Sequence, residues 1–357
     1  MTPGFWQDRR VFVTGHTGFK GGWLTTWLSA LGARVSGYAL PPAETPNLFD
    51  QLADRTITSQ IGDIRDPAAL AAALRAAQPE IVLHLAAQSL VRPSYTDPVG
   101  TYATNVMGTV HVLEAIRYVP SVRAAIIVTS DKCYHNDESG RPFREDDAFG
   151  GQDPYSNSKG CAELVTASYR ASFFGQQQSC AIASARAGNV IGGGDWSTDR
   201  LIPDILRAHD RGDCVTIRAP NATRPWQHVL EPLCGYLDLA EALCGPDGHA
   251  FAEGWNFGPD PAQAAPVRTV VEEFGTFLGV SWKIDPAPQV EEAHMLRIDS
   301  TKAQQRLGWH PRLSTHEALR WTAEWHQRLR AGEPAHTLVL EQIAAYDALR
   351  SRKSIPV

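Results

Sequence analysis

Short apolar runs alternate with helical segments along the first half of the chain, and this alternation limits the possible folds more than any other feature. The helical segments separate apolar runs at residues 10–14, 34–40, 56–61, 80–87, 123–129 and 180–186. The run at 80–87 is almost continuously apolar, as expected for a strand in a parallel sheet that helices cover on both faces. The pattern predicts an α/β fold with a Rossmann-type, doubly wound parallel sheet. Functional groups are then expected at the carboxyl ends of the strands.

Three glycines follow the first apolar run in the spacing Gly15-x-x-Gly18-x-x-Gly21, and a helical pattern begins among them. A glycine-rich turn between a strand and a helix lets the backbone approach a pyrophosphate, which the positive end of the helix also attracts. The spacing differs from the G-x-G-x-x-G fingerprint, and such a turn can also be no more than a tight corner. In this strand, turn and helix setting we expect dinucleotide binding.

The later strand ends leave the choice of dinucleotide open. The run at 34–40 ends without the Asp or Glu that would hold an adenosine ribose, and without an arginine for a 2′-phosphate. Asp63 follows the third run and could accept the adenine amino group. Its alternative role is that of a carboxylate at the N-terminus of the helix expected from Pro67. The residues themselves therefore do not separate NAD from NADP.

Tyr155 and Lys159 are four residues apart in a helical stretch, so their side chains are expected one turn apart on one face. A lysine ammonium beside a phenol favours the phenolate and lowers a pKa that starts near ~10. Ser130, at the end of the run at 123–129, could share the hydrogen bond to a substrate oxygen. This set of groups suits removal of a proton from an alcohol while hydride leaves its carbon, although the Tyr and Lys spacing alone is a weak signal.

Composition excludes several classes of function. The chain has 357 residues and a formal net charge of -6, with no run of lysine or arginine, which argues against a nucleic-acid or anionic membrane surface. Its six cysteines form no C-x-x-C pair, so neither a metal site nor a disulfide framework is indicated. No charged-then-apolar leader precedes the first strand, and no apolar run approaches the ~20 residues of a membrane span. We expect a cytoplasmic protein.

The regular alternation ends near residue 189, where glycines and prolines separate shorter segments. We expect a Rossmann domain over residues 1–188, to which later segments return, and a smaller substrate-binding lobe formed mainly by residues 189–357. The lobe contains three arginines that could bind a diphosphate or could be solvated surface residues. They are Arg200, Arg218 and Arg224.

Several motifs together resemble the extended short-chain dehydrogenases that act on nucleotide-sugars, over nearly the whole chain. They are Thr14-Gly15-x-x-Gly18-Phe19-x-Gly21, Gly62-Asp63, Leu85-Ala86-Ala87-Gln88, Asn105, Ser130, Tyr155-x-x-x-Lys159 and Leu307-Gly308-Trp309-x-Pro311. Within that superfamily the chain resembles most closely the branch of 4,6-dehydratases, through residues 15–21, 129–134, 187–196 and 224–229. The resemblance implies NAD as cofactor and CDP-glucose as substrate, and the preference for cytosine rests on this likeness alone.

The resemblance also implies catalytic roles for Ser130, Asp131, Lys132, Tyr155 and Lys159. Tyr155 as phenolate would take the proton of the C4 hydroxyl, Lys132 would remove the C5 proton, and Asp131 would protonate the leaving C6 hydroxyl. These roles require a raised pKa for Asp131 and a lowered pKa for Lys132. Which of the two is the acid and which the base stays open without variants.

The same resemblance implies the ligand contacts, and it implies no metal. Cofactor contacts are expected from Gly15, His16, Thr17, Gly18, Phe19, Lys20, Gly21, Asp63, Ile64, Leu85, Ala86, Ala87, Gln88, Asn105, Tyr155 and Lys159. Substrate contacts are expected from Gln88, Ser89, Asn189, Arg200, Leu201, Arg224, His228 and Asn256. Whether the side chains of His16 and Lys20 touch the cofactor or only flank it is open.

Other functions remain compatible with the sequence. A nucleotide-sugar 4-epimerase would use the same Tyr155 and Lys159 but lose no water, and a 4,6-dehydratase could act on another nucleotide-glucose. A non-catalytic NAD-binding sensor is the more distant alternative, since Ser130, Tyr155 and Lys159 are all present. Proteins of this kind usually pair through two long helices, here residues 101–119 and 155–174, so we expect a homodimer, with a tetramer also open.

Overall fold

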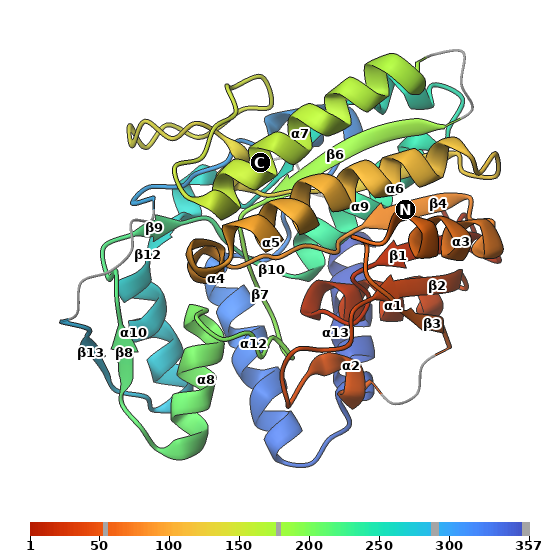
Figure 1. Cartoon of the computed structure of the whole chain (residues 1–357). Coiled ribbons are helices and arrows are strands. Elements are labelled where there is room, and N and C mark those ends of the chain that lie inside the picture. The colour runs from red at the N-terminus through yellow and green to blue at the C-terminus, as the bar shows by residue number, and fades with distance from the viewer. Residues whose placement is uncertain (53–55, 176–179, 287–292, 352–357) are drawn as a thin grey trace.

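The computed structural model describes residues 1–52, 56–175, 180–286 and 293–351. Its centre is a seven-stranded sheet in the order β11-β6-β5-β4-β1-β2-β3, in which every neighbouring pair is parallel. The strands are β1 Arg10–Thr14, β2 Arg34–Ala39, β3 Thr58–Ile61, β4 Ile81–His84, β5 Ala124–Val128, β6 Ala181–Ala187 and β11 Gly254–Phe257. The expected Rossmann-type sheet is confirmed (Figure 1).

Helices cover both faces of this sheet, which is why its strands read as apolar runs. Successive residues of β1 show the two faces: Val11 and Val13 belong to one core, and Phe12 belongs to the other. The first core contains side chains from α1 Phe19–Ala30, α9 Leu230–Leu243, α11 Thr301–Leu307 and α13 Ala335–Ser351. The second contains side chains from α3 Pro67–Ala77, α6 Gly108–Arg117 and α7 Pro154–Phe173.

The helix expected over residues 101–119 is built from three pieces. These are α5 Pro98–Tyr102, a π-helical turn at Ala103–Met107, and α6. The short helix α4 Val91–Thr96 directly precedes them, and another short helix, α2 Leu48–Gln51, follows β2. Asn105 lies inside the π-helical turn and is buried. An extra residue in one helical turn of this kind redirects a side chain, and such turns often mark functional regions.

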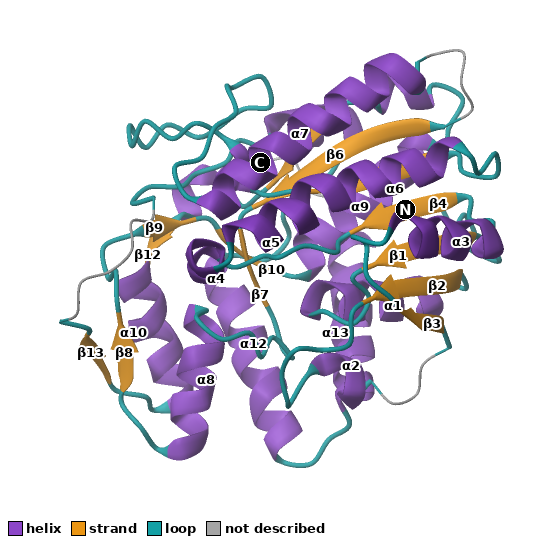
Figure 2. Cartoon of the chain, in the orientation of Figure 1, coloured by secondary structure: helices purple, strands orange, loops and turns teal. Residues whose placement is uncertain are grey.

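The second lobe consists of short strand pairs and three helices packed around a separate core. Its strands pair as β7 Asn189–Ile191 with β10 Trp226–His228, β9 Thr223–Arg224 with β12 Ala265–Pro266, and β8 Val215–Ile217 with β13 Trp282–Ile284. Its helices are α8 Leu201–Arg211, α10 Val267–Leu278 and α12 Thr315–Arg330 (Figure 2). Because β11 and α9 pack with the central sheet, later segments return to it; a boundary at residue 188 remains a prediction.

Among the described residues, no helix combines the length and apolar character needed to cross a membrane. The same residues contain no group of three or more His, Cys, Asp or Glu side chains that could hold a metal ion.

Candidate active site

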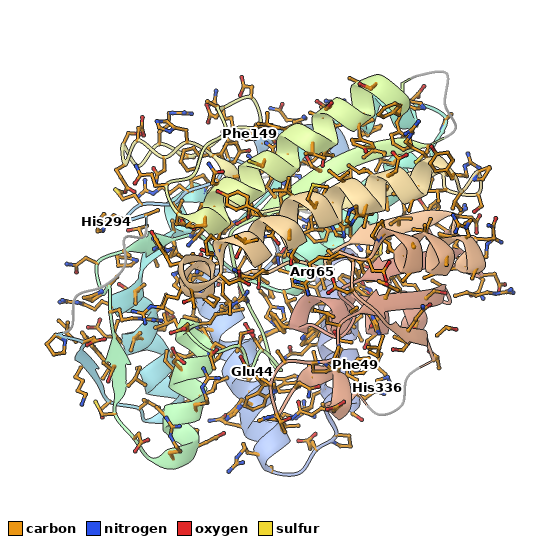
Figure 3. The ribbon with its side chains drawn as sticks, in the orientation of Figure 1. Glu44, Phe49, Arg65, Phe149, His294 and His336 are labelled. Atoms are coloured by element: carbon orange, nitrogen blue, oxygen red, sulfur yellow. The ribbon has the colours of Figure 1, made fainter. Side chains whose placement is uncertain are left out.

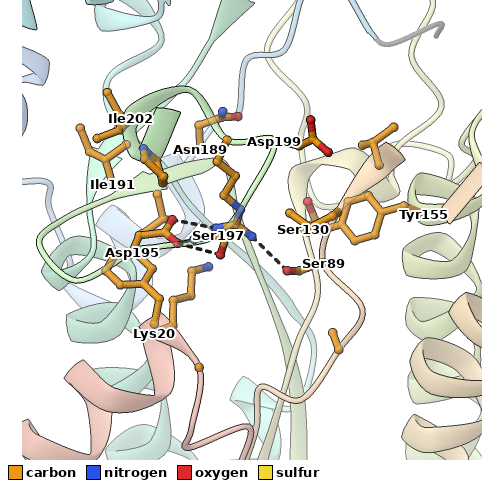
Figure 4. Close-up of a pocket in the computed structure, with 18 of the residues that line it drawn as sticks. Lys20, Ser89, Ser130, Tyr155, Asn189, Ile191, Asp195, Ser197, Asp199 and Ile202 are labelled. Carbon is orange, nitrogen blue, oxygen red and sulfur yellow. Dashed lines mark hydrogen bonds and ion pairs between the residues drawn. The ribbon is translucent and has the colours of Figure 1, made fainter. Parts of the chain in front are cut away.

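A cavity of about 1080 Å³ lies at the carboxyl ends of the central strands and extends into the second lobe. Residues from β1, β4, β5 and β6, or from the loops just after them, line one side, and residues 189–226 line much of the other. Figure 4 shows part of this cavity, with Ser130 and Tyr155 facing Lys20 and Asp195 across it. A cavity in this place is the expected ligand site of an open α/β sheet.

The turn after β1 forms a cradle of three glycines, Gly15, Gly18 and Gly21, that lines the cavity. Gly15 has a φ of 80°, and a Cβ there would meet the backbone nitrogen of Ala86 at 2.7 Å. A Cβ on Gly21 would lie 2.1 Å from the carbonyl oxygen of Gly15. The backbone can approach this closely only because Cβ atoms are absent, so the cradle fits the pyrophosphate of a dinucleotide.

The other residues of this turn differ in whether they line the cavity. Thr17, Phe19 and Lys20 line the cavity, and burial lowers the pKa of the Lys20 ammonium to about 7, helped by the positive charges of Arg200 and Lys159. His16 is fully buried and outside the lining. Its ring packs under β2, and its Nε2 lies 2.7 Å from the hydroxyl oxygen of Ser59. The side chain of His16 therefore supports the second strand and does not face the cavity.

Asp63 lines the cavity together with Ile64. Its carboxylate accepts hydrogen bonds from the guanidinium of Arg65, which lie at 2.5 to 3.0 Å and lower the pKa of Asp63 (Figure 3). The carboxylate at the start of α3 is instead Asp66, which accepts from the backbone nitrogens of Ala68 and Ala69. The alternative in which Asp63 is the carboxylate of this helix N-terminus is therefore wrong.

The loop after β4 contributes part of the expected cofactor surface. Leu85, Ala86, Ala87 and Ser89 line the cavity, whereas Gln88 and Asn105 do not. The side chain of Asn105 accepts from the backbone nitrogen of Gln88 and donates to its carbonyl oxygen, both at 2.9 Å. It also donates to the hydroxyl of Ser158 on α7. Asn105 thus fixes the loop to α7.

Gln88 lies outside the cavity lining because its own loop and Thr101 on α5 satisfy its side chain. Its amide nitrogen donates to the carbonyl oxygen of Leu90 and to the hydroxyl of Thr101, both at 3.0 Å. Its amide oxygen accepts from the backbone nitrogen of Leu90 at 2.6 Å. Gln88 therefore stabilises the loop after β4 and does not line the cavity.

A short turn after β5, which we call the Ser130 turn (residues 130–133), carries two titratable groups into the cavity. Ser130 caps this turn, accepting from the backbone nitrogen of Lys132 at 3.2 Å and donating to Oδ1 of Asp131 at 3.0 Å. Ser130, Asp131 and Lys132 all line the cavity. Tyr155 and Lys159, one turn apart near the start of α7, line it as well. The fold therefore brings all five expected catalytic residues to one cavity.

Burial of Tyr155 works against the phenolate that is expected from the sequence. Burial raises the pKa of the Tyr155 phenol to about 12, and a hydrogen bond with Ser130 offsets this only in part. Burial also lowers the pKa of Lys159 to about 8, and its Nζ donates to the carbonyl oxygen of Val128 at 3.3 Å. Desolvation of the phenol therefore opposes the phenolate, and it outweighs the positive charge of Arg200 nearby.

Asp131 has the properties expected of a proton donor. The side chain is 2% exposed, and burial raises the pKa of its carboxyl group. Its Oδ2 atom has no hydrogen-bond partner among the described residues, while Oδ1 accepts from Ser130. A buried carboxyl group with one unpartnered oxygen favours the protonated form, as general acid catalysis requires.

Two of the three arginines in the second lobe line the cavity and are paired with carboxylates, while their side chains remain partly exposed. Arg200 lies 3.2 Å from Oδ2 of Asp195 and donates to the hydroxyl of Ser89 at 3.0 Å (Figure 4). Arg218 lies 2.8 Å from Oδ1 of Asp199. All five of these residues line the cavity.

The third arginine, Arg224, is 5% exposed and lines the cavity from β9. Its NH1 donates to the carbonyl oxygens of Thr223 at 3.0 Å and His294 at 3.3 Å. Asn189 and Leu201, also expected at the substrate, lie in the same lining.

His228 and Asn256 were expected at the substrate, but they lie outside the cavity lining. His228 is fully buried, with its ring edge-on to Trp23 and Trp321 at centroid distances of 5.7 and 5.5 Å. Burial lowers the pKa of His228 to about 3, so it is neutral. Asn256 accepts from the hydroxyl of Tyr134 at 2.7 Å and supports the residues behind the Ser130 turn.

Three acidic residues that line the cavity near the arginines were not expected from the sequence: Glu44, Asp195 and Asp199. Asp195 and Asp199 pair with arginines, and Glu44 accepts from the backbone nitrogen and hydroxyl of Thr198 at 3.0 and 3.1 Å. This last contact ties the loop after β2 to the loop before α8 (Figure 3 labels Glu44). No motif signals these contacts: Asp195 and Arg200 are five residues apart, whereas the members of the other two contacts are 19 and 154 residues apart.

The parallel sheet, the glycine cradle at β1, and the Ser, Tyr and Lys side chains that converge on one cavity define a short-chain dehydrogenase. Comparison with known sequences gives the particular family: the family described as GDP-mannose 4,6 dehydratase matches residues 12–322. The chain belongs to that family.

Individual relatives agree with this assignment. The chain is 49% identical over 356 residues to a CDP-glucose 4,6-dehydratase of Salmonella typhimurium (strain LT2), covering 98% of this chain and 99% of that one. It is 27% identical to a UDP-glucose 4-epimerase of Mycolicibacterium smegmatis, over 88% and 98% of the two chains. The solved dTDP-glucose 4,6-dehydratase DesIV of Streptomyces venezuelae, with NAD and TYD bound, has a TM-score of 0.78 at 23% identity, covering 92% and 99%.

Proposed function

We propose that this chain is an NAD-dependent CDP-glucose 4,6-dehydratase, which converts CDP-D-glucose to CDP-4-keto-6-deoxy-D-glucose and water. The observation that carries the proposal is the Ser130 turn, which places Asp131 and Lys132 in the same cavity as Tyr155 and Lys159. Oxidation of an alcohol needs only Ser, Tyr and Lys, whereas elimination of water needs an additional acid and base. The 49% identity to a CDP-glucose 4,6-dehydratase supports both the reaction and the nucleotide.

The glycine cradle, Asp63 and the loop after β4 would hold the cofactor, with its pyrophosphate against Gly15, Gly18 and Gly21. When bound, NAD supplies the hydride acceptor, later the hydride donor, and a positive charge that favours a phenolate. Tyr155 is the residue that takes the proton of the C4 hydroxyl. Its pKa of about 12 must fall for this step, and the Lys159 ammonium and the cofactor charge both act in that direction.

The elimination step then falls to the Ser130 turn. The C4 ketone makes the C5 hydrogen acidic, and Lys132 removes it as base. Asp131, whose pKa burial raises, donates its proton to the leaving C6 hydroxyl, which departs as water. Lys132 would then return a proton to C5 as hydride passes from the reduced cofactor to C6, which regenerates NAD and gives the 4-keto-6-deoxy sugar. Ser130 holds Oδ1 of Asp131 by a hydrogen bond, and Oδ2 has no hydrogen-bond partner among the described residues.

The second lobe would bind the diphosphate through Asn189, Arg224 and Arg200. Arg224 is buried and held by backbone carbonyl oxygens, so it is fixed in place before the substrate arrives. Arg200 is paired with Asp195 and would exchange that partner, at least in part, for a phosphate.

We also propose a cytoplasmic homodimer. The helices expected to pair carry large exposed hydrophobic side chains, Met107 and Tyr118 within residues 101–119 and Leu164 and Phe173 on α7. These side chains are 41% to 61% exposed in the single chain, which is typical of a surface that a second copy covers. A monomeric mass by light scattering at micromolar concentration would refute the dimer.

Product mass tests the proposed reaction and the substrate together. The purified protein is incubated with NAD in deuterium oxide and, separately, CDP-, dTDP-, UDP- or GDP-glucose. We expect loss of water and gain of one deuterium at carbon 5 for the CDP-sugar alone. An unchanged mass with inversion at carbon 4 would instead identify a 4-epimerase, and dehydration of another sugar would correct the nucleotide.

A further inference from the structure

A buried ion pair behind the cavity connects the elements that carry the candidate catalytic residues. Glu163 on α7 and Arg186 on β6 are 2% and 3% exposed. Nε and NH2 of Arg186 each donate to a different carboxylate oxygen of Glu163 at 2.8 Å, and the hydroxyl of Ser184 donates to Glu163 at 2.6 Å. A two-pronged pair with additional hydrogen bonds is the arrangement in which buried charges are tolerated.

This pair contacts the chain on both sides of the Ser130 turn. The hydroxyl of Thr129, the residue just before the turn, donates to Oε1 of Glu163. Just after the turn, the hydroxyl of Tyr134 accepts from NH1 of Arg186 at 2.6 Å, and the Arg186 guanidinium lies 5.2 Å from the centroid of the Tyr134 ring. One ion pair therefore holds both ends of the segment that presents Asp131 to the cavity.

The same pair reaches Lys159 through α7. Glu163 follows Lys159 by four residues, so the two side chains lie one turn apart on one face of the helix. The negative charge of Glu163 favours the Lys159 ammonium, against the effect of burial. Neither Glu163 nor Arg186 lines the cavity, so neither is placed to touch a ligand.

We infer that Glu163, held by Arg186, is a positioning residue that fixes the Ser130 turn and places a negative charge one helical turn from Lys159. The role of Glu163 in turnover rests on the proposed function. The contact with Thr129 and the effect on Lys159 do not, because they are properties of the protein without substrate.

Lysine-selective NMR tests the effect on Lys159 without any substrate. The chain contains only six lysines, so protein labelled with carbon-13 at the lysine ε position gives few signals, and Lys159→Arg identifies the one that matters. We expect Glu163→Gln to lower the titration midpoint of Lys159 by about one pH unit or more. An unchanged midpoint in a folded Glu163→Gln protein would overturn the inference.

Glu231→Gln is the matched control. Glu231 is also a fully buried carboxyl group, accepting from the hydroxyl of Tyr346 and from the backbone nitrogens of Arg312 and Leu313, but it lies outside the cavity lining. We expect Glu231→Gln to leave the midpoint of Lys159 unchanged. A similar shift in both variants would mean that any buried carboxyl substitution perturbs the site, and this would also overturn the inference.

Kinetics with CDP-glucose separate positioning from simple loss of folded protein. We expect Glu163→Gln to lower kcat about 10- to 100-fold while KM stays nearly constant. The same variant should move the alkaline limb of kcat to lower pH. Glu163→Asp, which keeps the negative charge, should restore part of the rate. A wild-type protein that releases no water from CDP-glucose would refute the proposed function, while the NMR titration would still decide the role of Glu163.

Thr129→Val keeps the test decisive if Glu163→Gln does not fold. This substitution removes one hydrogen bond to Glu163 and leaves the ion pair in place. We expect kcat to fall about tenfold with little change in the midpoint of Lys159. Wild-type kcat in Thr129→Val would show that the pair does not position the Ser130 turn.

Discussion

The two halves of the cavity recognise their proposed ligands by different physical means. The cofactor half is built from glycines, where added Cβ atoms would lie 2.1 to 2.7 Å from backbone atoms of Gly15 and Ala86. The substrate half is built from arginines, of which Arg200 is already paired with Asp195 and Arg224 with backbone carbonyl oxygens. The first half selects by shape and the second by charge.

Because of this difference, the two halves should respond differently to amino-acid substitution. A surface that selects by shape loses affinity for its ligand when one carbon is added to it, because the backbone around that carbon cannot move away. A charge-balanced surface responds gradually, because a ligand phosphate competes with carboxylates that are already present. The Ser130 turn lies where the halves meet, so substitutions there should have the largest effects.

Asp131→Asn tests the Ser130 turn, which lies where the two halves of the cavity meet. The amide cannot donate an acid proton, so we expect kcat to fall by about 10²- to 10⁴-fold. Because burial raises the pKa of Asp131, its carboxyl group stays protonated above the usual range, and wild-type kcat should fall as this group loses its proton. This fall is separate from the alkaline limb that belongs to Lys159, and it should be absent in Asp131→Asn while the Lys159 limb remains. Wild-type kcat in the variant would exclude Asp131 as the acid.

Gly21→Ala tests whether the cofactor half selects by shape. The added Cβ would meet the carbonyl oxygen of Gly15, and we expect NAD binding, measured by calorimetry, to weaken about 100-fold, equivalent to about 2.7 kcal/mol. Gly175→Ala is the control, because nothing lies within 4 Å of a Cβ there. Unchanged NAD affinity in Gly21→Ala would contradict the steric account of the cradle.

Asp195→Asn tests whether the substrate half is balanced by charge. Asn keeps the Oδ1 acceptor for Ser197 but removes the charge opposite Arg200, so we expect CDP to bind about fivefold more tightly. Asp213→Asn, which removes an exposed pair with Arg211, should leave CDP affinity unchanged. Weaker CDP binding in Asp195→Asn would mean that Asp195 orients Arg200 for the substrate.

The regular half of the molecule could be predicted from the sequence, because its signals are local. Helix α3 begins at Pro67 as expected, and the strands lie within a few residues of the predicted runs. Local patterns also placed Gly15, Ser130 and Tyr155 at the ends of strands or the start of a helix, where a parallel sheet brings them together.

The remaining features depend on contacts between distant parts of the chain. The direction in which His16 and Gln88 point follows from Ser59 and Thr101, which their own segments do not contain. The π-helical turn around Asn105 interrupts a pattern that reads as one helix. The rise in the pKa of Tyr155 arises from burial that only the folded chain produces. No local pattern carries this information.

Lys132 and Asp131 are the residues proposed to turn the site of an alcohol dehydrogenase into the site of a dehydratase. The most direct test is one turnover of CDP-glucose by Lys132→Ala with bound NAD, following NADH absorbance and product mass in deuterium oxide. We predict that NADH forms and persists, with no loss of water and no deuterium at carbon 5. Dehydration at the wild-type rate would contradict the account and reduce both residues to bystanders.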